Sequence, residues 1–241
     1  MSESAVSSVG LPRWVSLRQN LFLVMVAILP LHTLFLSAWI SWKPFMLVLV
    51  ILGGMDLIEG ISYRRWPWNG VMTAAIGGFL LVVMIGWPEA EFFERFIRLW
   101  LALAMGGLVL LVTERSLRSP LMIERTLRVV FWSGAAMAAT GILLSFVLVG
   151  AFGREALDAI NDLPGVFRVA KPAYLKSGFV ALSNWHQDPG YGAAWANLWA
   201  VLALIAGARR PVSGRWWLDG VVVGGLAFTV VMAFSRTGWL V

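Results

Sequence analysis

Long apolar runs with few charges recur along almost the whole chain, and they limit the folds that it can adopt. The run from Trp216 to Phe234 holds about 19 residues, enough for a helix of about 28 Å, close to the hydrocarbon thickness of a bilayer. With 59% hydrophobic and 13% charged residues, a soluble domain could not bury so much apolar surface. We therefore expect an all-α, polytopic membrane protein with one membrane domain over residues 1–241. Its seven spans are predicted near 21–40, 45–63, 70–87, 96–113, 129–151, 190–208 and 216–236.

Basic residues are unevenly shared between the two sets of connections, and this asymmetry predicts the orientation. Lys and Arg concentrate in cytoplasmic loops. A cytoplasmic N-terminus places eleven of the nineteen basic residues inside: Arg13, Arg18, Arg64, Arg65, Arg115, Arg118, Arg125, Arg128, Arg209, Arg210 and Arg215. The 114–128 loop would then be cytoplasmic and the 152–188 loop external, starting as a short interfacial helix and continuing as irregular chain.

An arginine closes the last apolar run. As a helix-end anchor, Arg236 would extend its guanidinium to the interface. The order Ser235-Arg236-Thr237-Gly238, however, resembles the Ser-Arg-x-Gly signature of the O-antigen polymerase and ligase family. Upstream, Asp188-Pro189-Gly190 is similar to that family's Asp/Asn-Pro-Asn segment, with Gly190 in place of the usual Asn. The two motifs lie on consecutive spans, and the resemblance covers roughly residues 90–241.

The resemblance implies a function and a location. Such proteins transfer or polymerise glycan from a polyprenyl-pyrophosphate carrier to a glycan or lipid acceptor, on the periplasmic side of the bacterial inner membrane, without a cofactor or a metal. Arg236 would stabilise the pyrophosphate leaving group, with Ser235 beside the substrate. Family members continue through a further external loop and more spans, so we expect this chain to be an N-terminal portion. The net charge of +6 needs no nucleic acid, because basic loops beside anionic lipid account for much of it.

Further polar residues near the external mouths are candidates for substrate binding. Arg95 and Arg98 lie about one helical turn apart, and either point into the bundle as cations for an anionic ligand or extend to the interface at the helix end. His186 and Asp188 precede the sixth span. They could transfer a proton, or form a loop hydrogen bond with Asp188 as the helix cap.

Two carboxylates in the second span offer an alternative function. Asp56 and Glu59 are three residues apart on one helix face, where they could line the pathway of a transporter or channel. Alternatively, an interfacial ion pair with the nearby Arg64-Arg65 explains Glu59, and only Asp56 is left deep in the span. A non-catalytic membrane scaffold is the third possibility. No metal-ligand cluster is found in the sequence, and Asp219 is expected to pair with Arg215 at i−4.

Overall fold

The fold is predominantly helical. The computed structural model describes residues 13–30, 43–85, 93–143, 173–176, 179–182, 189–208 and 210–232, with four further helical positions at 151, 152, 155 and 159. These residues form α1 (Arg13–Ile28), α2 (Pro44–Ser62), α3 (Gly70–Ile85), α4 (Phe93–Ser116), α5 (Pro120–Ile142), β1 (Ala173–Lys176), β2 (Phe179–Leu182), α7 (Pro189–Gly207) and α8 (Trp216–Met232). The expected helical class is thereby confirmed.

Among the described residues, two helices are long and apolar enough to cross a membrane. They are α2 and the part of α4 from Phe96 to Ser116, and three shorter apolar helices occur in α3, α7 and α8. The seven predicted spans are therefore not all confirmed as spans, although helices occupy most of the predicted ranges.

The first predicted span is wrong in its position. The apolar run predicts 21–40, whereas α1 begins at Arg13 and ends at Ile28, and residues 31–40 lie outside the described part of the chain. Pro30 explains the end, because the proline ring disfavours helical backbone at the residue before it. α1 accordingly ends two residues before Pro30.

The predicted 114–128 loop is also wrong, because most of it is helical. α4 continues to Ser116 and α5 already starts at Pro120, whose fixed φ suits the first helical position. Two ion pairs at i,i+4 spacing, Arg118 with Glu114 and Arg128 with Glu124, occur in this stretch. Charged residues therefore sit on helical turns here, in a segment that hydropathy reads as a loop.

Part of the predicted irregular loop forms a hairpin instead. β1 and β2 pair antiparallel, with Ala173 opposite Leu182 and Lys176 opposite Phe179. The strands contain Tyr, Phe and Val, which favour extended backbone, and Ser177-Gly178 between them is a typical turn dipeptide. The described positions 151, 152, 155 and 159 are helical, in or next to the stretch expected to form a short helix.

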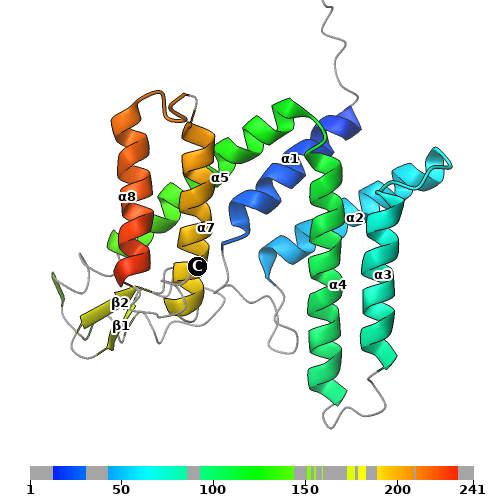
Figure 1. The fold of residues 1–241 in the computed structure, drawn as a ribbon, viewed down its shortest axis with the longest axis horizontal. Helices are drawn as coiled ribbons and strands as arrows, with labels where there is room; N and C mark the ends of the chain where they lie inside the picture. The colour runs from blue at the N-terminus through cyan, green and yellow to red at the C-terminus, as the bar shows by residue number, and fades with distance from the viewer. Residues whose placement is uncertain are drawn as a thin grey trace, which may run out of the picture.

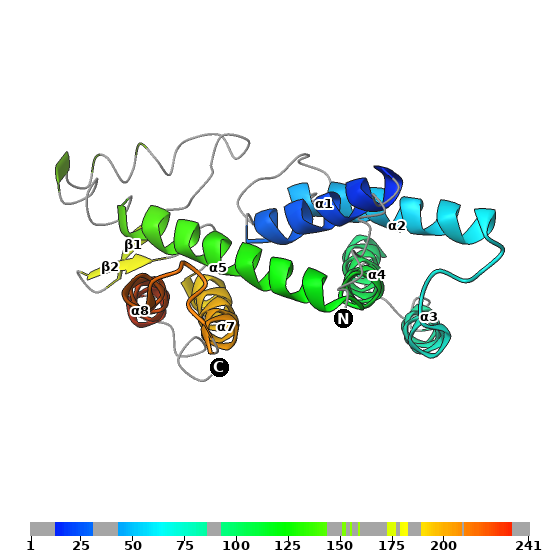
Figure 2. The same cartoon turned by 90° about the horizontal axis from the view of Figure 1, so that it is seen from above.

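The helices form two groups on either side of a central set (Figures 1 and 2). α7 packs against α8, and both pack against α5 beside the hairpin. α3 packs against α4 on the other side, and α4 also contacts α2. Between the groups, α1 packs on both α2 and α5. Fully buried side chains join the elements, and they include Phe22, Leu49, Val112, Met137 and Leu226.

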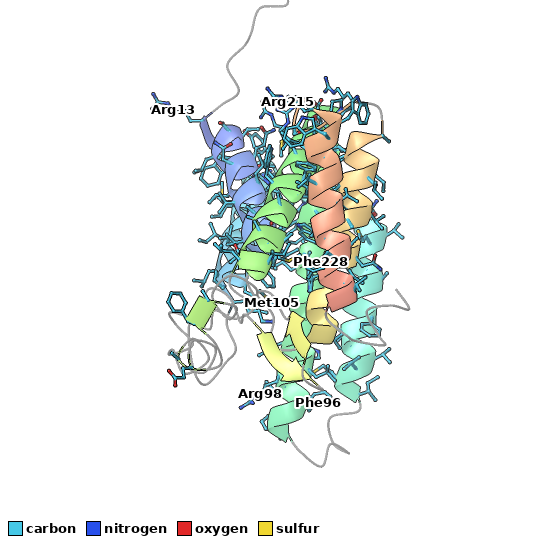
Figure 3. All side chains as sticks on the ribbon, turned by 90° about the vertical axis from the view of Figure 1, so that its left-hand side faces the viewer. Arg13, Phe96, Arg98, Met105, Arg215 and Phe228 are labelled. Atoms are coloured by element: carbon cyan, nitrogen blue, oxygen red, sulfur yellow. The ribbon has the colours of Figure 1, made fainter. Side chains whose placement is uncertain are left out.

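The helices alternate in direction, so their ends gather at two opposite ends of the molecule. Arg13 and Arg215 lie at one end and Arg98 at the other (Figure 3). The turns at 63–69, 117–119 and 208–215 join helices at the end that carries Arg13 (Figure 1). That end is referred to below as the basic end.

Candidate functional site

A buried cluster of charged residues joins α1, α2 and α4 near the basic end. The carboxylate of Asp56 is fully buried, and Arg18 donates to both of its oxygens, from Nε at 2.5 Å and from Nη2 at 3.0 Å. The indole Nε1 of Trp68 donates to the same carboxylate at 3.1 Å. A carboxylate held by paired guanidinium donors and an indole is satisfied although no water reaches it.

Arg115 connects this carboxylate to a second one. Its Nη2 donates to Oε1 of Glu59 at 2.6 Å, and its Nη1 lies 3.3 Å from Oδ1 of Asp56, at ion-pair distance without hydrogen-bond geometry. The cluster thus contains two guanidinium groups and two carboxylates and is neutral as a whole. The Arg18 side chain is only 9% exposed, and burying a charge to this extent is costly. The opposite charges within the cluster offset much of that cost.

The partners of Asp56 and Glu59 differ from those expected. The sequence interpretation pairs Glu59 with the adjacent Arg64 and Arg65 and leaves Asp56 deep in the span, whereas the structure supplies Arg18 from α1 and Arg115 from α4. The signal for a partner was present, because a carboxylate inside an apolar helix requires a compensating charge. Which arginine supplies that charge depends on helix packing, since Arg18 lies 38 residues away in sequence.

These contacts favour a connecting role for the two carboxylates over a transport pathway. An ion or proton pathway needs a carboxylate that can exchange its partner for water or an ion. Both Asp56 and Glu59 are instead engaged by arginines from other helices. The cluster therefore holds three helices together at one level of the bundle.

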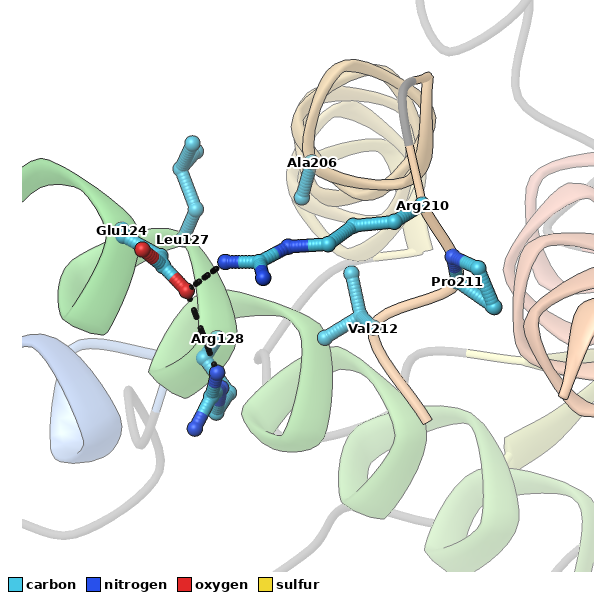
Figure 4. Close-up of a pocket in the computed structure, with 7 residues that line it drawn as sticks. All are labelled: Glu124, Leu127, Arg128, Ala206, Arg210, Pro211 and Val212. Atoms are coloured by element: carbon cyan, nitrogen blue, oxygen red, sulfur yellow. Dashed lines mark hydrogen bonds and ion pairs between the residues drawn. The ribbon is translucent and has the colours of Figure 1, made fainter. Parts of the chain in front are cut away.

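A second, exposed charge cluster links α5 to the α7–α8 connection (Figure 4). Glu124 accepts from Arg128 at 3.2 Å and also from Arg210, beside a small cavity of about 60 Å³. The Glu124 side chain is 45% exposed, so water screens these pairs and each contributes little stability. At the neighbouring turn, Glu114 hydrogen-bonds Arg118, and this bond raises the pKa of that guanidinium.

Asp219 has different partners from the predicted Arg215. Its carboxylate accepts from the backbone N–H of Val212 at 2.7 Å and of Ser213 at 3.0 Å, and from the Ser213 hydroxyl at 2.5 Å. The side chain therefore closes the turn before α8. An aspartate in the first turn of a helix also favours the positive end of the helix dipole.

The predicted external site falls mostly outside the described residues. Arg236, Ser235, His186 and Asp188 all lie there, so their predicted roles stay predictions. Arg95 belongs to α4, and Arg98 is exposed near the start of the same helix.

The described ends nearest to these residues are not all adjacent. α4 and α8 lie on opposite sides of the central helices (Figures 1 and 2). The start of α7 and the end of α8, in contrast, lie together beside the hairpin. Within the described residues, no group of three or more His, Asp or Glu side chains could hold a metal ion.

Comparison with known proteins found no match: no family model, curated protein or solved structure matches the chain.

Proposed function

We propose that this protein acts as a membrane glycosyltransferase, which transfers or polymerises glycan from a polyprenyl-pyrophosphate carrier on the periplasmic side of a bacterial inner membrane. The observation that carries the proposal is the pair of motifs, Asp188-Pro189-Gly190 and Ser235-Arg236-Thr237-Gly238. The first motif overlaps the start of α7, and the second follows the end of α8.

The packing of α7 on α8 supports a shared site for the two motifs. These helices run in opposite directions and contact each other, so the start of one and the end of the other lie at the same end of the molecule. β2 contacts both helices there. The start of α7 and the end of α8, the described ends next to the two motifs, therefore lie together at the end opposite to the basic end.

The exposed surface supports a membrane location. Large apolar side chains face outward on the helices, including Val71 and Ile85 of α3, Leu99 of α4 and Leu204 of α7, each more than half exposed. Soluble monomers rarely expose contiguous apolar surface of this kind, whereas a bilayer covers it. The gathering of arginines at the basic end supports a cytoplasmic location of that end.

In this function the chemical role falls to Arg236. When the acceptor hydroxyl attacks the anomeric carbon, the bond to the carrier breaks and its electron pair leaves with the pyrophosphate, while the hydroxyl proton passes to a base, for which His186 and Asp188 are the candidates. A guanidinium presents paired, planar donors to the phosphate oxygens and stabilises the charge that develops there. Ser235, His186 and Asp188 are the proposed substrate-binding residues next to it. Arg95 and Arg98 are proposed to bind a more distant part of the substrate, because α4 and α8 lie on opposite sides of the central helices.

Replacement of Arg236 tests the proposal. Arg236→Ala should slow glycan transfer by about a hundred- to a thousandfold, the effect of losing one contact of roughly 3–4 kcal/mol in the transition state. Arg236→Lys should also impair transfer, because an ammonium group cannot reproduce the paired donors. Glycan chain length is measured by gel electrophoresis in cells whose only copy carries the change.

The matched control is Arg215→Ala, which removes an arginine at the basic end and should leave transfer almost intact. Normal glycan chains with Arg236→Ala, at equal protein abundance, would show that Arg236 is only a helix-end anchor.

A further inference from the structure

An open hollow of about 460 Å³ lies beside the buried charge cluster at the basic end. The last turn of α2, the turn that follows it and the end of α4 form its walls. Its lining residues include three arginines, two aromatic residues and one acidic residue: Arg65, Arg115, Arg118, Tyr63, Trp66 and Glu59. A hollow of this kind combines positive charge with aromatic surface.

The turn after α2 is held tightly against the helix, which fixes the shape of the hollow. Arg64 has a φ of +52°, and the N–H groups of Arg64 and Arg65 donate to Ile61 and Gly60, a helix end that usually places glycine at the left-handed position. A Cβ on Gly60 would lie 2.7 Å from the Arg65 carbonyl oxygen and 2.8 Å from Cδ of Pro67. Gly60 therefore allows the close approach, and the strained Arg64 persists because its neighbours hold it.

The three arginines of the hollow differ in their partners. Arg115 pairs with Glu59, and Arg118 forms two hydrogen bonds with Glu114, at 3.0 and 2.9 Å. Arg65 is exposed and forms no ion pair with any residue that the structure describes. The hollow thus carries one uncompensated positive charge, that of Arg65. The guanidinium groups of Arg115 and Arg118 next to it have further N–H donors.

Exposed aromatic side chains border the hollow where α2 ends. Tyr63 is 72% and Trp66 59% exposed. Aromatic rings of this type typically lie at the level of lipid headgroups. Ile58 and Ile61 are also exposed, but by helical spacing they lie on the face of α2 away from Glu59 and Tyr63 and do not border the hollow. The hollow and its rings therefore match the anionic headgroup of a lipid, next to a helix that is long and apolar enough to cross a membrane.

We propose that this hollow binds the headgroup of an anionic phospholipid, with Arg65 as the main phosphate ligand. The acyl chains would extend from the hollow into the bilayer, along the apolar helices α2 and α4 that border it. Basic pockets between helices on the cytoplasmic side typically hold such headgroups. The site is independent of the proposed glycan transfer, because it lies at the opposite end of the molecule from the start of α7 and the end of α8.

The test uses the full chain, purified in a neutral detergent. Phosphatidylglycerol is titrated into the micelles, and the lipid retained on the protein is counted by native mass spectrometry. Arg65→Gln removes the uncompensated charge from an exposed side chain and should weaken retention about fivefold, the effect expected for one arginine near a headgroup. Arg125→Gln, an equal change of charge at an exposed position outside the hollow, should bind as the unchanged protein does.

Three results would overturn the proposal. Equal retention by the Arg65→Gln and Arg125→Gln variants would show that Arg65 does not hold the lipid. Equal retention of phosphatidylcholine would show that the headgroup charge is not recognised. Displacement of phosphatidylglycerol by inorganic phosphate at comparable concentrations would show a site for free phosphate, in which the acyl chains take no part.

Discussion

Substitution of Asp56 by Asn should destabilise the protein more than any other single change in the buried charge cluster. The substitution keeps the size of the side chain but removes its charge, so Arg18 is left buried without a carboxylate. Removing one partner of a buried ion pair costs about 3–5 kcal/mol. For a chain of this length, that corresponds to a fall in Tm of about 6–20 °C.

The two sides of the pair should respond unequally. Arg18→Met leaves Asp56 with Trp68 as a hydrogen-bond donor and with Arg115 at 3.3 Å, so the buried carboxylate keeps two partners. We therefore expect a smaller loss of stability than for Asp56→Asn. The double substitution Arg18→Met with Asp56→Leu removes both charges and should recover part of the loss, because apolar replacement of a whole buried pair is often close to neutral.

The assay is thermal unfolding of the purified chain in a mild detergent, followed by circular dichroism at constant detergent concentration. Glu124→Gln is the matched control, since it removes a carboxylate that also accepts from two arginines but is 45% exposed. It should cost at most about 1 kcal/mol. A Tm for Asp56→Asn within about 2 °C of the unchanged protein, or a double variant less stable than Asp56→Asn, would refute a buried pair that joins α1 to α2.

Two further changes test the packing and the orientation. A Cβ at Gly107 would lie 2.5 Å from Cγ2 of Ile76, whereas a Cβ at Gly106 would meet no atom within 4 Å. Gly107→Ala should therefore unfold at a lower Tm than Gly106→Ala, because the clash lowers its free energy of unfolding by about 1–3 kcal/mol. Equal Tm values for the two variants would contradict the contact between α3 and α4. Cysteines at Ser119 and Ser177 should react oppositely with an impermeant thiol reagent in intact cells, and labelling of Ser119→Cys would reverse the predicted orientation.

Several helices could be placed from the sequence within a few residues. α2, α3, α7 and α8 each coincide with an apolar run of at most two charged residues, which begins next to a proline, glycine or tryptophan. Such runs are recognisable because a long apolar segment in this composition has few alternatives to a helix. The linear chain also reveals the motif around Arg236 and the preference of arginines for one end of the molecule.

The starts of α1 and α5 could not be placed in the same way. Both begin in charged segments, at Arg13 and Pro120, where hydropathy predicts no helix. In α5, the pair of Glu124 and Arg128 forms only once the chain is helical. A hydropathy average over a window of residues counts the charged residues in it, but it does not take account of their i,i+4 spacing.

The sequence alone determined the helical class, most of the apolar helices and the need of Asp56 for a compensating charge. Tertiary structure decided which residues satisfy that need, because Arg18, Trp68 and Arg115 reach the carboxylate only when α1, α2 and α4 are packed together. The physical reason is that burial can be inferred from composition one segment at a time, whereas an ion pair depends on the distance between side chains from different helices.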